Sequence, residues 1–230
     1  MNWVLTCEHG GYALPRAYGT LGLSRADLRD HIGWDPGAAA VSRELAKRLS
    51  APVVASKYSR LLIDCNRDPG EASLIPEASD GRVVPGNLGV TAAERRRRLE
   101  RFHAPYHARV DRMLERACRR FGSEGLVLLS MHSFTPSLDG RERPFDLGVL
   151  FDDHRALAHQ AGRALRRVGF AVRYNEPYSG LDGLIYAARR HGRAHGVPYI
   201  ELEMNNARIG TPSSQLRMAR SLARALRSLG

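Results

Sequence analysis

Two histidines and one carboxylate stand at positions where their side chains could meet around a metal ion. His9 and His132 each come just after an apolar run typical of a buried strand, and Asp35 stands at the expected start of a helix. Two imidazoles and a carboxylate around an open fourth position are the ligands of a catalytic zinc site. Each residue alone also fits a structural role. Because the three follow separate elements that could meet at one edge, we expect them to bind one Zn²⁺ ion per chain.

Two glutamates could supply the base that such a site needs. Glu201 and Glu203 are two apart on an expected strand, so both side chains point to one side while the apolar residues between them point to the other. Carboxylates on an inner strand are costly to bury without a partner, and a water activated by a metal is such a partner. We expect Glu203 to be the base, because it lies nearer the carboxyl end of the strand, with Glu201 beside it. The alternative is an edge strand with a solvated face.

Arginines near these positions could bind an acidic substrate. The segment SRLLIDCNR at 59–67 is the densest polar group, although Asp64 could instead hold an arginine in an internal ion pair. A guanidinium group binds a carboxylate through paired hydrogen bonds. The residues expected to contact substrate are Arg60, Asn66, Arg67, Ser133, Arg141, Arg143 and Arg208.

Other potentially reactive residues are weaker candidates for metal binding or catalysis. His103 and His107 are four apart, the spacing of a metal pair on a helix, but an apolar stripe runs beside them and we favour a packing or substrate-edge role. Cys7 could be a nucleophile beside His9, although a cysteine at a strand end is more often a small buried hydrophobe. The sequence has no P-loop, dinucleotide-binding or G-x-S-x-G motif. A metal-dependent enzyme is therefore favoured over a nucleotide-binding protein or a serine hydrolase.

Alternating strands and helices must position these residues. Strands are expected at 2–7, 53–55, 60–64, 126–131, 145–151, 171–174 and 199–204, and helices at 36–49, from Thr91 to beyond Ala117, at 156–167, 182–190 and 213–229. Residues 66–90, rich in Gly, Pro, Asp and Ser, are expected to form a long functional loop. The pattern predicts an α/β fold, one domain over 1–230, with a mainly parallel mixed sheet and helices on both faces. Ligands of such sheets bind beyond the carboxyl ends of the strands.

Composition narrows the function classes further. The 230 residues are 43% hydrophobic and carry a net charge of 35 − 24 = +11, mostly from arginines spread over expected helices. Because no nucleic-acid-binding motif accompanies this charge, we expect no nucleic-acid partner. No stretch has the roughly 18 apolar residues of a membrane helix, and the N-terminus does not resemble a signal peptide. Three cysteines without a paired spacing favour a reducing compartment, and we expect a cytoplasmic protein. The oligomeric state is not indicated.

The ordered set of motifs resembles the N-formylglutamate amidohydrolase family. The matching segments are CEHGG at 7–11, HIGWDPGA at 31–38, SRLLIDCNR at 59–67, PYH at 105–107, MHSFTP at 131–136, DLGVL at 146–150, NEPYSGLDGLIYAARRHG at 175–192 and YIELEMNN at 199–206. The resemblance implies a zinc-dependent amide hydrolase with a phosphorylase/hydrolase-like fold. It also implies metal ligands at His9, His132 and an intervening carboxylate, and a base at Glu203.

The third metal ligand has two candidates, Asp35 and Glu8. We favour Asp35, because Glu8 directly precedes His9 and neighbouring side chains of an extended segment point in opposite directions. The expected function is hydrolysis of the amide bond of an N-acyl amino acid such as N-formylglutamate. The alternatives are an amidase or carboxypeptidase-like hydrolase acting on peptides or cell-wall material, and a basic protein that binds nucleic acid without catalysis.

Overall fold

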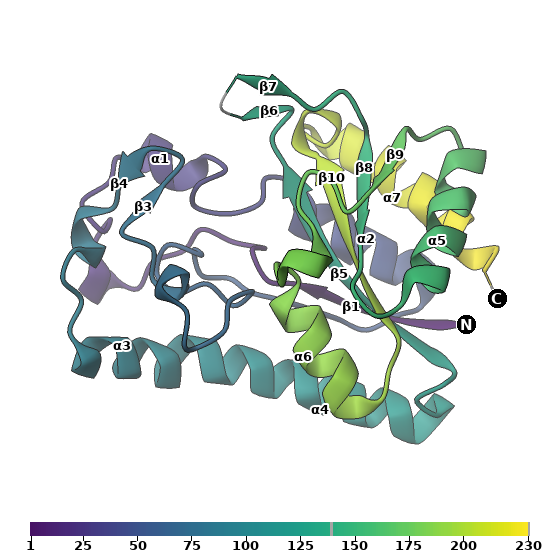
Figure 1. Cartoon of the computed structure of the whole chain (residues 1–230), viewed down its shortest axis with the longest axis horizontal. Helices are drawn as coiled ribbons and strands as arrows, with labels where there is room; N and C mark the ends of the chain where they lie inside the picture. Colours follow the sequence, from purple (N-terminus) through teal and green to yellow (C-terminus); the bar gives the residue numbers. More distant parts are fainter. Residues whose placement is uncertain (139, 230) are drawn as a thin grey trace.

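A six-stranded mixed sheet forms the centre of the protein in the computed structural model, which describes residues 1–138 and 140–229 (Figure 1). Its strands are β1 (Asn2–Cys7), β2 (Val53–Ala55), β5 (Leu126–Phe134), β8 (Leu147–Leu150), β9 (Val172–Tyr174) and β10 (Tyr199–Asn205), in the order β2-β1-β5-β10-β8-β9. The first four strands of this order are parallel, β8 is antiparallel to β10, and β9 is parallel to β8. The carboxyl ends of β1, β5 and β10 therefore lie at one edge.

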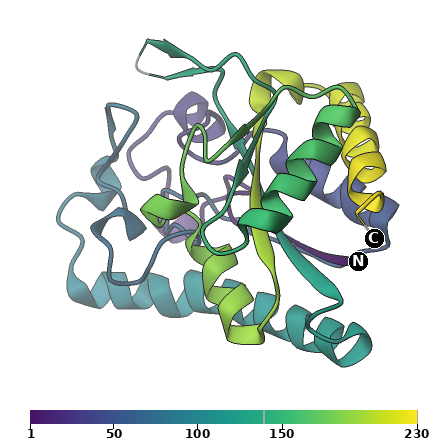
Figure 2. The same ribbon diagram turned by 45° about the vertical axis from the view of Figure 1, so that its right-hand side comes forward.

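Helices cover both faces of the sheet, as the alternating pattern predicts. On one face lie α2 (Ala38–Leu49), α5 (Arg155–Arg167) and α7 (Pro212–Arg227), whose buried residues form one core with alternate side chains of the strands, and Figure 2 shows α5 and α7 next to each other. On the other face α4 (Ala104–Phe121) and α6 (Tyr186–His195) form a second core. The expected α/β class with a mainly parallel mixed sheet is confirmed. Within residues 1–138 and 140–229, no helix is long and apolar enough to cross a membrane.

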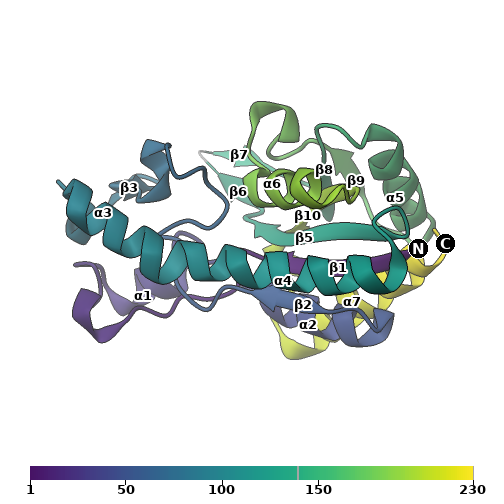
Figure 3. The ribbon, with the colours of Figure 1, turned by 90° about the horizontal axis from the view of Figure 1, so that it is seen from below.

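An extension beside the sheet is built from the segments that follow β1 and β2. It contains α1 (Arg25–Arg29), the hairpin of β3 (Ala78–Ser79) and β4 (Arg82–Val83), and α3 (Ala92–Arg98), and it has small apolar clusters of its own. A π-helical turn, Leu99–His103, joins α3 to α4, so that one long helix runs beneath both parts of the molecule (Figures 1 and 3). A second short hairpin is formed by β6 (Ser137–Leu138) and β7 (Arg141–Glu142). Short 3₁₀ turns lie at Arg16–Tyr18, Ala72–Leu74, Pro85–Asn87, Gly180–Asp182 and Asn206–Arg208.

The expected strand at 60–64 is wrong. This apolar run is a turn segment, in which the amide of Leu62 donates to the carbonyl of Ser59. Its consecutive apolar side chains are buried in two different clusters of the extension, Leu61 in one and Leu62 and Ile63 in the other. An apolar run of this length indicates burial, but it does not distinguish a strand from a buried turn. Residues 66–90, expected to be one long loop, contain β3, β4 and two of the 3₁₀ turns.

Asp35 is not the cap of a helix, contrary to expectation. The helix α2 begins at Ala38, after Gly37 in the left-handed region with φ 81°. A Cβ at Gly37 would lie 2.6 Å from the carbonyl oxygen of Ile209, so only glycine fits this close approach. The displaced helix start leaves the carboxylate of Asp35 free to point toward His9 and His132.

Candidate metal-binding and catalytic site

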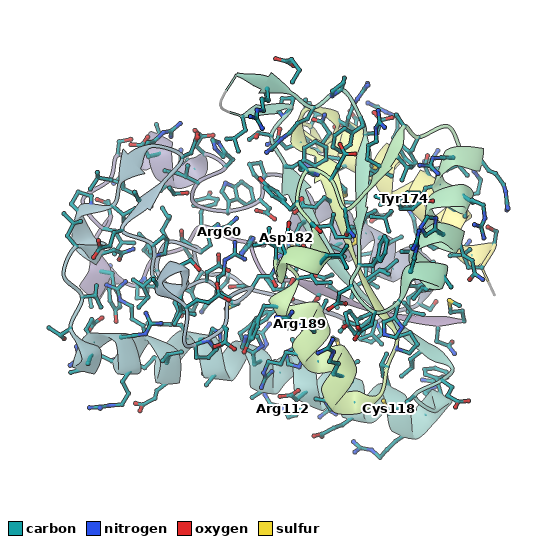
Figure 4. The ribbon with its side chains drawn as sticks, in the orientation of Figure 1. Arg60, Arg112, Cys118, Tyr174, Asp182 and Arg189 are labelled. Atoms are coloured by element: carbon teal, nitrogen blue, oxygen red, sulfur yellow. The ribbon has the colours of Figure 1, made fainter. Side chains whose placement is uncertain are left out.

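A cavity of about 390 Å³ opens at the carboxyl ends of β1, β5 and β10, the edge at which parallel sheets bind ligands. Arg60 lies beside it, between the extension and the sheet (Figure 4). The volume is in the range of small-molecule sites. The cavity is lined by His9, His31, Asp35, Arg60, Asn66, Arg67, Ser79, Asp80, Gly81, His132, Ser133, Phe134, Thr135, Leu138, Tyr178, Leu184, Glu201 and Glu203.

His9, Asp35 and His132 converge at the cavity and are all buried. The Nδ1 atom of His132 lies 2.8 Å from Oδ2 of Asp35, and Nδ1 of His9 lies 3.5 Å from Oδ1 of the same carboxylate. One donor atom from each residue lies within 4.8 Å of the other two. His132 lies within β5, which continues to Phe134 because it pairs with β10, and not after the end of the strand as expected.

The other nitrogen of each imidazole contacts a different carboxylate. Nε2 of His9 lies 2.6 Å from Oδ1 of Asp64, and Nε2 of His132 lies 3.0 Å from Oε2 of Glu8. Such outer partners fix the tautomer and the orientation of metal-binding histidines. Nδ1 of His9 is buried and has no hydrogen-bond partner within the described part of the chain. This orphaned atom, facing Asp35, fits a metal ligand.

Glu8 lies on the far side of His132 from Asp35. Its carboxylate accepts hydrogen bonds from the hydroxyls of Tyr106 at 2.8 Å and Ser130 at 2.7 Å, and it also contacts Nε2 of His132. Burial alone would raise the pKa of Glu8, but the contacts with His132, Ser130 and Tyr106 outweigh it and lower the pKa to about 2. Its oxygens are therefore occupied by neighbours, at the imidazole nitrogen opposite the one that faces Asp35.

Glu201 and Glu203 both line the cavity, while the apolar residues between and after them lie in the core on the other side of the sheet, as expected. In the pairing of β10 with β5, Glu203 is level with His132 and Glu201 is level with Ser130, one step deeper. Glu201 accepts a hydrogen bond of 3.3 Å from the side-chain amide of Asn66, and burial raises its pKa. Oε2 of Glu203 is buried without a partner in the described residues, and burial raises the pKa of this carboxyl group to about 8.

Acidic side chains are concentrated at the site. Five buried acidic residues surround the two histidines: Glu8, Asp35, Asp64, Glu201 and Glu203. Arg60 balances part of this charge, with its guanidinium 3.0 Å from Asp64 and 3.8 Å from Asp35. Because uncompensated buried charge is costly, a divalent cation bound between the histidines would stabilise the arrangement. Charge and donor set both fit a metal.

The residues expected to contact substrate fall into two groups. Arg60, Asn66, Arg67 and Ser133 line the cavity. The others do not. Arg143 packs over the ring of Tyr178, which does line it, Arg141 lies on the exposed strand β7, and Arg208 forms an ion pair of 2.9 Å with Asp146 at the surface.

Several residues at the site were not singled out from the sequence. Asp64 was expected at most to pair with an arginine, yet it also contacts His9. The hydroxyl of Tyr106, on the apolar stripe of α4, reaches Glu8 because of how α4 packs on β1, which no spacing in the sequence reveals. Asp80 of the β3–β4 turn contacts His31 at 3.0 Å beside the cavity. Cys7 is buried, and burial raises the pKa of its thiol to about 12, which fits the apolar role expected of it.

The structure thus has a histidine–carboxylate centre at the carboxyl edge of a mainly parallel sheet. Residues 1–209 match the family described as N-formylglutamate amidohydrolase. The chain belongs to this family, which confirms the resemblance of its motifs.

Individual relatives agree with the family match. The N-formylglutamate deformylase of Pseudomonas putida is 34% identical over 121 residues, 46% of this chain and 44% of that protein, and that of Pseudomonas aeruginosa is 32% identical over the same shares. The alignments thus span less than half of these relatives. The crystal structure of gene product Atu2144 from Agrobacterium tumefaciens is similar with a TM-score of 0.91 and 34% identity, covering 99% of this chain and 91% of that one. N-formylglutamate amidohydrolase from Ralstonia eutropha shares the fold, with a TM-score of 0.72, 23% identity and coverage of 99% and 92%.

Proposed function

We propose that this protein hydrolyses the amide bond of an N-acyl amino acid, with N-formylglutamate as the leading substrate, at a zinc ion bound by His9, Asp35 and His132. The observation that carries the proposal is the convergence of these three side chains on a cavity that also contains Oε2 of Glu203, which has no hydrogen-bond partner among the described residues. Membership of an amidohydrolase family supports the reaction class.

Zinc suits this donor set, because two imidazoles and a carboxylate leave a fourth position open. When bound, the ion would polarise the amide carbonyl and lower the pKa of a water molecule. The chain itself holds the ligands in place. Asp64 orients His9 and Glu8 orients His132, each through the nitrogen that faces away from Asp35. Glu8 is therefore proposed as an orienting residue and not as the third ligand.

Glu203 is the proposed general base. Next to a bound cation the carboxylate of Glu203 would be ionised. Its oxygen accepts the proton of the attacking water and donates it to the leaving nitrogen as the C–N bond breaks, so that formate and a free amine result. Its position level with His132 places it next to the proposed ligands. Glu201 lies one step deeper, where Asn66 holds one of its oxygens, and it acts as a supporting residue.

Arginines of the cavity are proposed to bind the substrate carboxylates. Arg60 and Arg67 both line the cavity, and the two carboxylates of glutamate need two cationic partners. Asn66 and Ser133 offer further hydrogen bonds. Arg208 is not part of this proposal, because it pairs with Asp146 outside the cavity.

A substrate panel tests the proposal. Purified protein loaded with Zn²⁺ is incubated with N-formyl-, N-acetyl- and N-succinyl-glutamate and with a dipeptide ending in glutamate, and release of the amine is measured with and without chelator. We expect the formyl compound to be cleaved fastest and chelation to abolish the reaction. Faster cleavage of the dipeptide would favour the carboxypeptidase-like alternative, and cleavage of none would refute the proposal.

The remaining features support a small-molecule enzyme of the cytoplasm. Cys7, Cys65 and Cys118 are free thiols, the first two of them buried, which suits a reducing compartment. The partner in this proposal is the N-acyl amino acid itself. Nucleic acid is not proposed as a partner.

A further inference from the structure

A second cluster of metal-binding side chains lies outside the cavity, between two helices. It consists of Asp111 on α4 and His191 and His195 on α6, which pack side by side on the same face of the sheet. In Figure 4, Arg112 on α4 and Arg189 on α6 mark the neighbouring turns of the two helices. The motif H-x₃-H at 191–195 places both imidazoles on one side of α6, facing α4.

The donor atoms of this cluster converge on one carboxylate oxygen. Oδ1 of Asp111 lies 2.7 Å from Nδ1 of His191 and 3.1 Å from Nε2 of His195. One donor atom from each residue lies within 4.8 Å of the others, as in the histidine–carboxylate centre of the cavity. Two imidazoles and a carboxylate favour Zn²⁺ and chemically similar transition metals over Mg²⁺ or Ca²⁺, which bind oxygen ligands.

A partner behind His191 fixes its ring. Nε2 of His191 lies 2.8 Å from Nδ1 of His107, and Nε2 of His107 lies 3.1 Å from Nε2 of His103. His191 is therefore held by its inner nitrogen while its outer nitrogen faces Asp111.

The cluster is open to solvent on its outer side. The side chain of His191 is fully buried, whereas those of His195 and Asp111 are 16% and 30% exposed, which leaves a path for an ion and room for water ligands. Arg190 is the competing cation: its guanidinium lies 3.7 Å from Oδ2 of Asp111, and its Nη1 lies 3.2 Å from Nδ1 and 3.0 Å from Nε2 of His191. Because the side chain of Arg190 is 38% exposed, it can turn to solvent when an ion binds Oδ1 of Asp111 and Nδ1 of His191.

We propose that Asp111, His191 and His195 bind a second transition-metal ion of the zinc type, which clamps α4 to α6. The chain then binds two such ions in sites of different purpose. The ion between the helices crosslinks two elements that are otherwise joined by packing and hydrogen bonds. It stabilises the folded protein, because an ion that binds only the folded state raises its stability by mass action.

Metal content and thermal unfolding test the proposal. Chelator-treated wild type, His195→Ala and the control His159→Ala, a histidine on α5 outside both clusters, are titrated with Zn²⁺, and bound zinc per chain is measured after removal of free metal. We expect His195→Ala to bind one ion fewer than wild type and His159→Ala to bind as many. Asp111→Asn is a second variant that leaves the buried His191 in place, and we expect the same loss.

The unfolding temperature gives an independent readout. In the His132→Ala background, which removes a ligand of the other centre, Zn²⁺ at about 100 times its Kd should raise Tm by about 5 °C or more, and adding His195→Ala should abolish most of that rise. Equal zinc content in His195→Ala and wild type would overturn the proposal. So would a zinc-dependent rise in Tm that is the same with and without His195.

Discussion

The two histidine–carboxylate clusters have similar donor sets but very different surroundings. His9, Asp35 and His132 come from three segments far apart in sequence and meet at a cavity beside Glu203, whose Oε2 atom has no partner in the described part of the chain. The cluster of Asp111, His191 and His195 comes from two neighbouring helices and faces solvent. The donor set alone therefore does not define a catalytic centre. The first cluster also has a cavity, the proposed base Glu203 and a carboxylate partner on each imidazole. We therefore propose catalysis at the first cluster and a stabilising role for the second.

Loss of His132 should reduce the activity more than any other substitution predicted below. Without one of its two imidazoles the cavity centre should lose its metal, and with it the several kcal/mol of transition-state stabilisation that a metal supplies. We expect His132→Ala to lower kcat/KM for N-formylglutamate by at least about 10³-fold. The matched variant His159→Ala should keep the parent rate. Full activity and full zinc content in His132→Ala would show that this histidine is not a ligand.

Replacing the proposed base should spare the metal and reduce the rate. Glu203→Gln keeps the shape of the side chain but cannot accept a proton, so kcat should fall by about 10²–10⁴-fold with zinc content unchanged. Glu201→Gln should lose less, because Glu201 is held by Asn66 one step deeper in the sheet. If Glu201→Gln were inactive and Glu203→Gln fully active, the two roles would be reversed.

A smaller effect is expected from the residues that orient the ligands. Asp64→Asn keeps the size of the side chain but removes the charge that contacts Nε2 of His9 at 2.6 Å. Loss of such a partner weakens metal binding by about 10–100-fold, which competition with a chelator of known affinity would measure. Asp64 also pairs with Arg60, a proposed substrate-binding residue. The substrate affinity of the zinc-loaded variant is therefore measured as a control. Unchanged zinc affinity would remove Asp64 from the account.

The last prediction concerns the pH dependence of stability at the buried histidines of the second cluster and its neighbour His107. Burial lowers the pKa of His107 below its usual range and that of His191 to about 4, so both are neutral in the folded protein but bind protons when unfolded below about pH 6.5. The stability that these groups contribute is complete above pH 6.5 and is lost as the pH falls toward the folded pKa. With chelator present, the free energy of unfolding should fall by about 2 kcal/mol for each of these two groups between pH 7.5 and pH 5.

Urea unfolding at the two pH values measures this loss, and His107→Gln provides the comparison. The variant should show a smaller fall, because one of the two buried imidazoles is gone. If His107→Gln showed the same dependence as wild type, protons taken up elsewhere would have to explain it.

The sequence predicts the sheet better than the extension. Continuous apolar runs between helical segments identified the core strands. The two-residue spacing of Glu201 and Glu203 correctly predicted that both face away from the core that contains Leu202 and Met204. The segment at 60–64 was wrong because Leu61 and Leu62 are buried in separate small clusters, which only tertiary packing decides. The start of α2 was wrong because Gly37 packs against Ile209, a residue more than 170 positions away.

The functional site was also predictable only in part. Ligands of parallel sheets bind beyond the carboxyl ends of the strands, and this rule predicted that the polar residues there lie close together. The partners behind the histidines could not be predicted, because Tyr106 and Asp64 reach the site through the packing of α4 and of the turn at 59–67. The second cluster was missed although H-x₃-H stands at 191–195, because its carboxylate lies 80 positions earlier on another helix.

A crystal structure of the zinc-loaded protein, with anomalous scattering measured at the zinc edge, would identify the metal ligands directly. We predict a peak at 2.0–2.2 Å from Nδ1 of His9, Nδ1 of His132 and a carboxylate oxygen of Asp35, with Glu8 still on the opposite nitrogen of His132. A peak bonded to Glu8 and Nε2 of His132, with Asp35 remote, would show that Glu8 and not Asp35 is the third ligand.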